Sequence, residues 1–259
     1  MPRRNSNANG DTECARRWAG FPVTSRWAAA HADALLVAGC GGEQGGAALF
    51  DVLTGAVVPA GRLPYEIHHD QADLEDITVY GDLANQTYRN RQFAPAPLYR
   101  FGDGRSFSRF RYSSARLSPA APGVCDSVTL HVDVKNEGSE AAEEVVQVYS
   151  RCPCSAALCQ AGSCASAALS APPSTALIAF TRTAIAAGAT ATVSLPIATR
   201  QRARFRATDM EEVVRPGELW LTVGGGQLGS STAGEVLQLR ANVTGQETAL
   251  AACAPIGAM

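Results

Sequence analysis

The hydrophobic pattern of the chain changes to a period of two after Ser113, and this change limits the possible folds more than any other feature. From Val128 to Lys135 apolar side chains alternate with polar ones, as in a strand with one buried face. Asn136-Glu137-Gly138 then predicts a turn, and Val145 to Tyr149 predicts a returning strand. Together these segments indicate an antiparallel hairpin.

Four more apolar segments follow, with Pro or Gly turns between them and little sign of helix. They are Ala176–Thr181, Thr190–Leu195, Leu219–Val223 and Val236–Val243. Short strands at such spacing are typical of an immunoglobulin-like antiparallel β-sandwich. We therefore predict a mainly β fold, with the sandwich over residues 113–245 and a Cys-rich insert at 151–172.

A different pattern precedes the sandwich, at residues 27–64. An apolar run at 34–38 leads into a glycine-rich loop, a helix is predicted from Ala47 to Leu53, and an extended arm ends at Pro64. One strand and one helix cannot bury each other's apolar faces, because a parallel sheet needs neighbours on both sides. The sequence therefore predicts the truncated end of a larger α/β sandwich domain.

Residues 65–112 form a polar segment that is too long for an ordinary connection. We predict an extended aromatic linker, held on a neighbouring surface by its rings. These rings belong to Tyr80, Tyr88, Phe93, Tyr99, Phe101, Phe107, Phe110 and Tyr112. Residues 1–26 show no sustained pattern and are predicted to be an unstructured tail, and residues 246–259 are predicted to be a second tail.

The glycine-rich loop has one rival interpretation, a dinucleotide-binding loop between a strand and a helix. Gly39, Gly41 and Gly45 are spaced G-x-G-x-x-x-G rather than G-x-G-x-x-G, and Glu43 would put a carboxylate where the pyrophosphate lies. We therefore predict no cofactor-binding residues here.

Four groups of motifs follow one another along the chain. They are Gly42-Glu43-Gln44-Gly45-Gly46-Ala47 with Pro59-Ala60-Gly61-Arg62-Leu63-Pro64, Thr87-Tyr88-Arg89 with Pro97-Leu98-Tyr99-Arg100-Phe101-Gly102, Val132-Asp133-Val134-Lys135-Asn136 with Glu144-Val145-Val146-Gln147-Val148-Tyr149, and Val214-Arg215-Pro216-Gly217-Glu218 with Val223-Gly224-Gly225. In this order the chain resembles the C-terminal portion of glycoside hydrolase family 3, in the β-xylosidase and β-glucosidase enzymes that carry a fibronectin type III-like domain. The plant- and invertebrate-type β-xylosidase branch fits best.

The resemblance implies a parent enzyme that hydrolyses β-linked xylosides or glucosides with retention of configuration and takes part in carbohydrate and xylan breakdown. Such enzymes need two carboxylates about 5 Å apart. In the family the nucleophilic Asp lies on an N-terminal barrel, and the acid/base Glu lies upstream of the motif at 42–46. The resemblance therefore implies that this chain holds no catalytic residue and is inactive alone.

The partners implied by the resemblance are the barrel and α/β domains of the parent enzyme, with polysaccharide as a further candidate. No metal or other cofactor is implied. The alternative is a stand-alone fibronectin type III-like module that binds a carbohydrate or a protein.

Several polar residues could be mistaken for a site. We expect Glu43 to be structural or exposed, because a lone carboxylate lacks the partner that glycoside chemistry requires. The acidic run of Asp70, Asp73, Glu75 and Asp76 is typical of a solvated loop. Arg62, Arg89 and Arg100 could bind sugars or carboxylates, but such arginines more often stack on rings and hold loops. His31, His68, His69 and His131 have no metal-ligand spacing, so we predict no metal site.

Two further features leave alternatives open. Cys152, Cys154, Cys159 and Cys164 could form local disulfides, bind zinc, or stay as thiols in an insert. The triplets that begin at Asn85 and Asn242 are N-glycosylation sequons, which are used only in a secretory lumen.

Composition excludes some partners. The net charge of −2 argues against general binding to nucleic acid or anionic membranes. No run approaches the roughly 18 apolar residues that span a bilayer. The N-terminal residues lack the apolar core of a signal peptide, although the resemblance implies a secreted parent enzyme.

Overall fold

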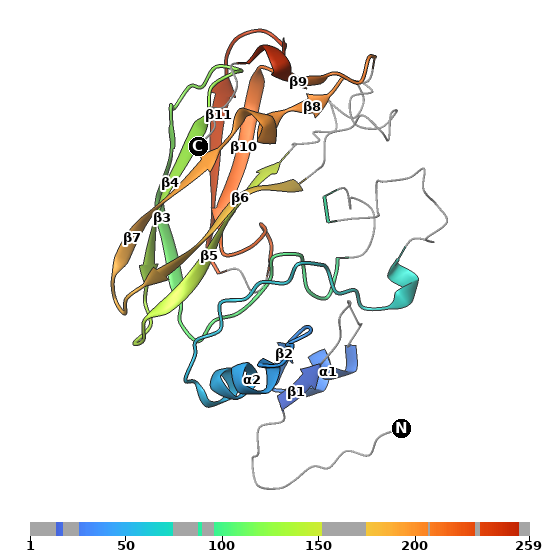
Figure 1. The fold of residues 1–259 in the computed structure, drawn as a ribbon, viewed down its shortest axis with the longest axis vertical. Coiled ribbons are helices and arrows are strands. Elements are labelled where there is room, and N and C mark those ends of the chain that lie inside the picture. Colours follow the sequence, from blue (N-terminus) through green and yellow to red (C-terminus); the bar gives the residue numbers. More distant parts are fainter. Residues whose placement is uncertain are drawn as a thin grey trace, which may run out of the picture.

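The structure is a computed structural model, and it describes residues 14–17, 26–74, 88–89, 96–151, 175–206, 208–230 and 234–253. Its largest part is a β-sandwich of two antiparallel sheets, with strand orders β11-β10-β5-β6 and β3-β4-β7 (Figure 1). The strands are β3 (Phe110–Ser118), β4 (Val128–Asn136), β5 (Ala142–Arg151), β6 (Thr175–Ile185), β7 (Thr190–Ile197), β10 (Gly217–Gly224) and β11 (Val236–Val243).

The core between the two sheets follows from the alternating sequence. Val128, Leu130, Val132 and Val134 of β4 are all 0% exposed, while the residues between them are less buried. They belong to one apolar cluster with side chains from β5, β6, β7 and β10. The predicted mainly β, antiparallel sandwich is therefore confirmed.

A small three-stranded sheet lies at one end of the sandwich, at the top of Figure 1. It has the order β12-β9-β8, with bounds Thr248–Ala249, Glu212–Val214 and Arg204–Phe205, and the 3-10 helices η3 (Thr199–Arg202) and η4 (Leu250–Ala252) accompany it. A disulfide joins Cys125 to Cys253. The segment 246–259, expected to be a tail, is therefore folded as far as Cys253, because strand pairing and this covalent bond hold it in place.

A short α/β unit lies at the other end, at the bottom of Figure 1. Strand β1 (Cys14–Arg17) pairs in parallel with β2 (Ala34–Val37), beside α1 (Arg26–His31) and α2 (Gly45–Thr54). Strand β1 falls in the segment expected to be a tail. Helix α2 ends at Gly55, which adopts the left-handed φ of 79° that glycine tolerates. Within the described segments, none of the helices has the length and apolar character needed to cross a bilayer.

The segment between the α/β unit and the sandwich contains η1 (Gln71–Asp73) and several of the predicted aromatic contacts. Tyr88 stacks on Phe101 with ring centroids 4.1 Å apart, and Tyr112 is 2% exposed. Phe107 differs from the expectation, since it is 64% exposed. Tyr80 and Phe93 lie outside the described residues.

Candidate functional site

Segments from several of the motifs meet in space at one place, which we call the motif junction. It consists of the extended arm 61–64, the turn 100–104, strand β5 and the loop 225–230. The arm and the turn are joined by backbone bonds, with Leu63 N donating to Asp103 O over 2.9 Å and Gly102 N donating to Leu63 O over 2.8 Å. A Cβ on Gly104 would lie 2.5 Å from the Gly61 carbonyl oxygen, so this contact requires glycine.

Arg62 and Glu144 form the charged part of the motif junction. Arg62 Nη2 donates to Glu144 Oε2 over 2.6 Å, and Arg62 Nε donates to the Gly225 carbonyl over 3.1 Å. The two side chains are only 10% and 3% exposed. On its other oxygen, Glu144 accepts a hydrogen bond from the Tyr112 hydroxyl at 2.6 Å.

The Tyr112 phenol is held in its protonated form by these surroundings. Burial, and then the charge of the Glu144 carboxylate, raise the pKa of Tyr112 well above its ordinary value. The phenol therefore acts as a hydrogen-bond donor that shares the Glu144 charge with Arg62.

A second group of hydrogen bonds holds the turn against the outer face of β5. Gln147 Nε2 donates to the carbonyls of Gly102 and Gly225 over 3.1 and 2.9 Å, and Tyr149 donates to Gln147 Oε1 over 2.6 Å. Gly102 has a φ of 84°, and a Cβ there would lie 2.4 Å from both Gln147 Oε1 and the Tyr149 hydroxyl. Burial also raises the pKa of Tyr149.

Asp103 completes the motif junction. Its carboxylate accepts from the Arg100 backbone N at 2.8 Å and from the Ser230 hydroxyl. The loop is tied once more by Gln227 Nε2, which donates to the Phe101 carbonyl over 2.9 Å. Asp103 is 3% exposed and Glu144 is 2% exposed, so neither carboxylate is accessible to a sugar. The polar contacts of this site hold separate segments of the chain together.

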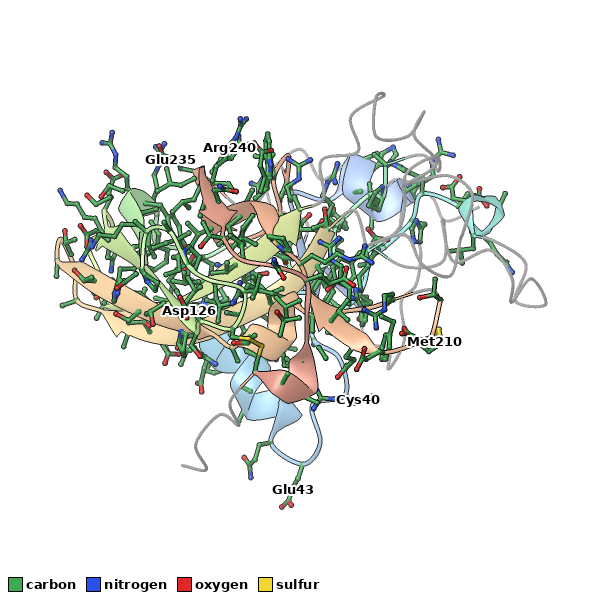
Figure 2. The ribbon with its side chains drawn as sticks, turned by 90° about the horizontal axis from the view of Figure 1, so that it is seen from above. Cys40, Glu43, Asp126, Met210, Glu235 and Arg240 are labelled. Carbon is green, nitrogen blue, oxygen red and sulfur yellow. A yellow bond between two sulfur atoms is a disulfide. The ribbon has the colours of Figure 1, made fainter. Side chains whose placement is uncertain are left out.

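The structure places Glu43 apart from the motif junction. It lies on the exposed loop before α2, and its side chain points away from the molecule (Figure 2). This agrees with the expectation of an exposed residue. Cys40, on the same loop, is also exposed.

The predicted arginines have different roles. Arg62 binds a carboxylate, as described. The Arg89 carbonyl accepts a hydrogen bond from Thr175 N over 3.1 Å, and the Arg100 backbone N donates to Asp103. Asp70 and Asp73 form a reciprocal capping box on η1. Glu75 and Asp76 lie outside the described residues.

His31, His68 and His131 lie at separate contacts. His31 Nδ1 lies 2.8 Å from the Trp27 carbonyl, His68 lies 3.8 Å from Glu66, and His131 is hydrogen-bonded to Ser194. In the described part of the chain, no group of three or more His, Cys, Asp or Glu residues could hold a metal ion. Cys152, Cys154, Cys159 and Cys164 lie outside that part.

Sequence reasoning did not single out Glu144, Gln147 or Tyr149 as functional residues, although it quoted their motif. The sequence does indicate that both faces of this strand are buried, because bulky or apolar residues occur at consecutive positions rather than at alternate ones. Val146 and Val148 face the core, while Gln147 and Tyr149 are buried on the opposite face by the turn 100–104.

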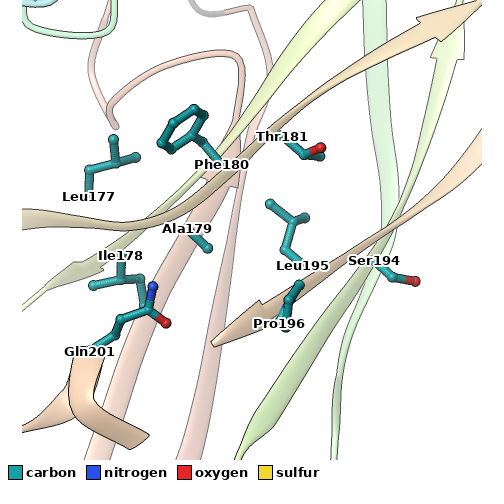
Figure 3. Close-up of a pocket in the computed structure, with 9 residues that line it drawn as sticks. All are labelled: Leu177, Ile178, Ala179, Phe180, Thr181, Ser194, Leu195, Pro196 and Gln201. Atoms are coloured by element: carbon teal, nitrogen blue, oxygen red, sulfur yellow. The ribbon is translucent and has the colours of Figure 1, made fainter. Parts of the chain in front are cut away.

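One pocket lies between the strands β6 and β7, with a volume of about 430 Å³ (Figure 3). Its lining includes Leu177, Phe180, Ser194, Pro196 and Gln201. No acidic or basic side chain belongs to the lining, so this pocket offers no group for acid/base chemistry.

The fold and the motif junction define a β-sandwich that is tied by buried polar contacts to the end of an α/β unit. Residues 18–107 match the glycosyl hydrolase family 3 C-terminal domain, and residues 144–227 match the fibronectin type III-like domain. The chain belongs to glycoside hydrolase family 3, as the motifs predicted.

Its relatives are longer proteins. A β-glucosidase from Rhizobium radiobacter is 34% identical over 178 residues, which cover 63% of this chain and 20% of that protein. The β-glucosidase cel3A from Pyricularia oryzae is 30% identical over 74% of this chain and 28% of its own length. A solved β-glucosidase from Erythrobacter marinus superposes with a TM-score of 0.70 at 26% identity, over 89% of this chain and 28% of that one. The matched part of the chain thus spans from one fifth to just over one quarter of the length of these relatives.

Proposed function

We propose that the chain is the structural C-terminal portion of a retaining β-glycosidase, in which the motif junction fixes the fibronectin type III-like sandwich to the α/β part. The observation that carries this proposal is the Arg62–Glu144–Tyr112 contact. It joins the arm that leaves α2 to the sandwich through buried, charge-assisted hydrogen bonds.

We infer that the remaining barrel and α/β domains of a parent enzyme are the partners of α2. On α2, Phe50 is 65% exposed and Leu53 is 56% exposed, whereas Leu49 is 7% exposed. Val57, which follows the helix, is 50% exposed. An apolar helix face of this kind is normally covered by another layer of an α/β domain.

The proposed substrate class is a β-linked glucoside or xyloside. The relatives reported above are named β-glucosidases, which favours the glucoside, while the motifs fit the xylosidase branch. We propose that the catalytic carboxylates are supplied by other domains, because Asp103 and Glu144 are buried and Glu43 is isolated.

Activity assays test this proposal directly. The purified chain, offered an aryl β-glucoside and an aryl β-xyloside, is expected to release no product above the buffer rate. The Glu43→Gln variant is expected to behave in the same way. Hydrolysis by the chain that disappears in Glu43→Gln would overturn both the assignment of Glu43 and the proposed structural role.

The pocket beside Phe180 supports a second candidate, a carbohydrate-binding module. The Phe180 ring is 67% exposed, and the uncharged polar side chains of Ser194 and Gln201 also belong to the lining of this pocket. Aromatic rings with nearby hydrogen-bonding groups suit apolar sugar faces. If this candidate is correct, xylan or β-glucan in a native gel retards the chain and Phe180→Ala abolishes the retardation. Phe107→Ala, which removes another exposed ring, should have no effect.

A further inference from the structure

Strand β11 ends in a sequence feature that the motif junction does not use, the triplet Asn242-Val243-Thr244. Alternation along the strand sends Leu237 and Leu239 toward the core, while Val243 is 5% exposed and packs in a second apolar cluster. Asn242 is exposed on the opposite face of the strand. The acceptor amide of a sequon therefore points to solvent.

This amide lies on an edge strand, at the end far from the motif junction. Strand β11 is an edge strand, and its register with β10 pairs Val236 with Gly224 at one end and Val243 with Gly217 at the other. The loop that follows Gly224 enters the motif junction, so Asn242 lies at the far end of the strand from it. In Figure 1 this end of β11 and helix α2 lie at opposite ends of the molecule.

The neighbouring side chains are engaged with one another. Trp220 Nε1 donates to Glu218, the cross-strand partner of Asn242, over 2.9 Å. The guanidinium of Arg240, labelled at the surface in Figure 2, lies 3.5 Å from the centre of the Trp220 ring. Attachment of a group at Asn242 breaks none of these contacts.

A second, independent observation concerns the compartment. Cys125 and Cys253 are joined by a disulfide across 128 residues of sequence. Such bonds persist in oxidising compartments, which include the lumen of the secretory pathway where sequons are used. The sequon and the disulfide therefore indicate the same route of maturation.

We propose that Asn242 is an N-glycosylation site of the folded sandwich. The donor is an oligosaccharide linked to a polyprenyl pyrophosphate. In the transfer, a bond forms between the Asn242 Nδ2 atom and the anomeric carbon, the bond from that carbon to the pyrophosphate oxygen breaks, and the amide loses one proton to a base. The Thr244 position supplies the hydroxyl that the sequon requires.

The test directs the full chain into the secretory pathway of a yeast by a cleavable leader, and analyses both the medium and the lumenal fraction. The Asn85→Gln background removes the other sequon. An N-glycan-releasing glycosidase should increase mobility on a gel and leave aspartate at position 242, which peptide mass spectrometry identifies. Peptide mapping without reductant should recover Cys125 bound to Cys253.

Matched variants make the result specific. Asn242→Gln and Thr244→Ala should abolish the mobility shift, whereas Thr244→Ser should keep it, because serine also satisfies the sequon. Asparagine found unmodified at position 242 in lumenal or secreted chain overturns the proposal. A glycosidase-sensitive shift that survives Thr244→Ala overturns it equally.

Discussion

At the scale of single residues, Glu144 is the group on which the motif junction depends most. Its carboxylate is shared between the Arg62 guanidinium and the Tyr112 hydroxyl, away from water. A buried charge is tolerated only while its partners remain, since loss of one partner leaves the charge without compensation in a poor solvent. Arg62 should therefore matter more to stability than any surface arginine.

We expect Arg62→Ala to lower the free energy of unfolding by about 3–5 kcal/mol, the usual cost of breaking a buried ion pair. Urea denaturation followed by tryptophan fluorescence measures the change. The matched control is Arg182→Ala, because Arg182 pairs with Glu143 while the two side chains are 57% and 44% exposed. Loss of that surface pair should cost at most about 1 kcal/mol. Equal losses in the two variants would contradict a special role for Arg62.

Tyr112 should make the stability depend on alkaline pH. Its pKa is raised above the ordinary value of 10.0, first by burial and then by the Glu144 charge, so the folded chain keeps a proton that the unfolded chain releases. The stabilising contribution is complete below pH 10 and is lost as the pH rises toward the folded-state pKa. We expect the free energy of unfolding to fall there by up to about 1.4 kcal/mol per pH unit for this group.

Urea midpoints measured on both sides of pH 10 check this prediction. Tyr112→Phe should have a shallower fall, although part remains because burial raises the pKa of Tyr149 as well. The same slope in the variant and in the unchanged chain would show that Tyr112 is not responsible.

At the scale of secondary-structure elements, the period of the sequence predicts the strands but does not predict which elements contact one another. Strand β11 occupies the predicted range Val236–Val243, because its apolar residues alternate and clear turn residues bound it. Strand β5 runs over Ala142–Arg151, beyond the predicted Val145–Tyr149. At its N-terminal end the buried Glu144 lies outside the predicted range, because a period-two pattern assumes that buried positions are apolar.

Contacts between distant elements could not be predicted from local pattern. Arg62 and Glu144 are 82 residues apart in the sequence. Nothing in the sequence around either residue distinguishes it from an ordinary charged residue at the surface. Their pairing arises only when the arm, the turn and β5 are brought together by the fold. The expectation that Glu43 is structural or exposed agrees with its exposed position on the loop before α2.

The disulfide is the clearest contact between elements for experiment. It ties η4 and β12 to the loop before β4, so Cys253→Ser should lower the free energy of unfolding by about 2–5 kcal/mol. Urea denaturation measures it, and a dithiol reductant should destabilise the unchanged chain to a similar extent. Cys40→Ser serves as the control, because Cys40 is exposed and unbonded. A reductant that leaves the urea midpoint unchanged would contradict the bond's role.

At the scale of the whole molecule, the two ends differ in how well they cover their apolar side chains. The sandwich buries a continuous core, whereas α2 presents Phe50 and Leu53 to solvent. This contrast is consistent with the proposal that another domain covers α2. It also implies that the isolated chain can associate through α2, because contiguous exposed apolar side chains promote association.

We therefore expect the purified chain to self-associate through α2 in a concentration-dependent way, as measured by sedimentation velocity. The double variant Phe50→Glu/Leu53→Glu should weaken the association by on the order of 100-fold or more, because each buried side chain contributes about 1.5–3 kcal/mol. Glutamate keeps the helical propensity of α2, so the fold should survive, as circular dichroism can verify. Phe180→Glu on β6 is the control, since it removes an equally exposed ring from a different surface. A chain that stays monomeric at all concentrations, or one that Phe180→Glu dissociates instead, would place the partner-binding face somewhere other than α2.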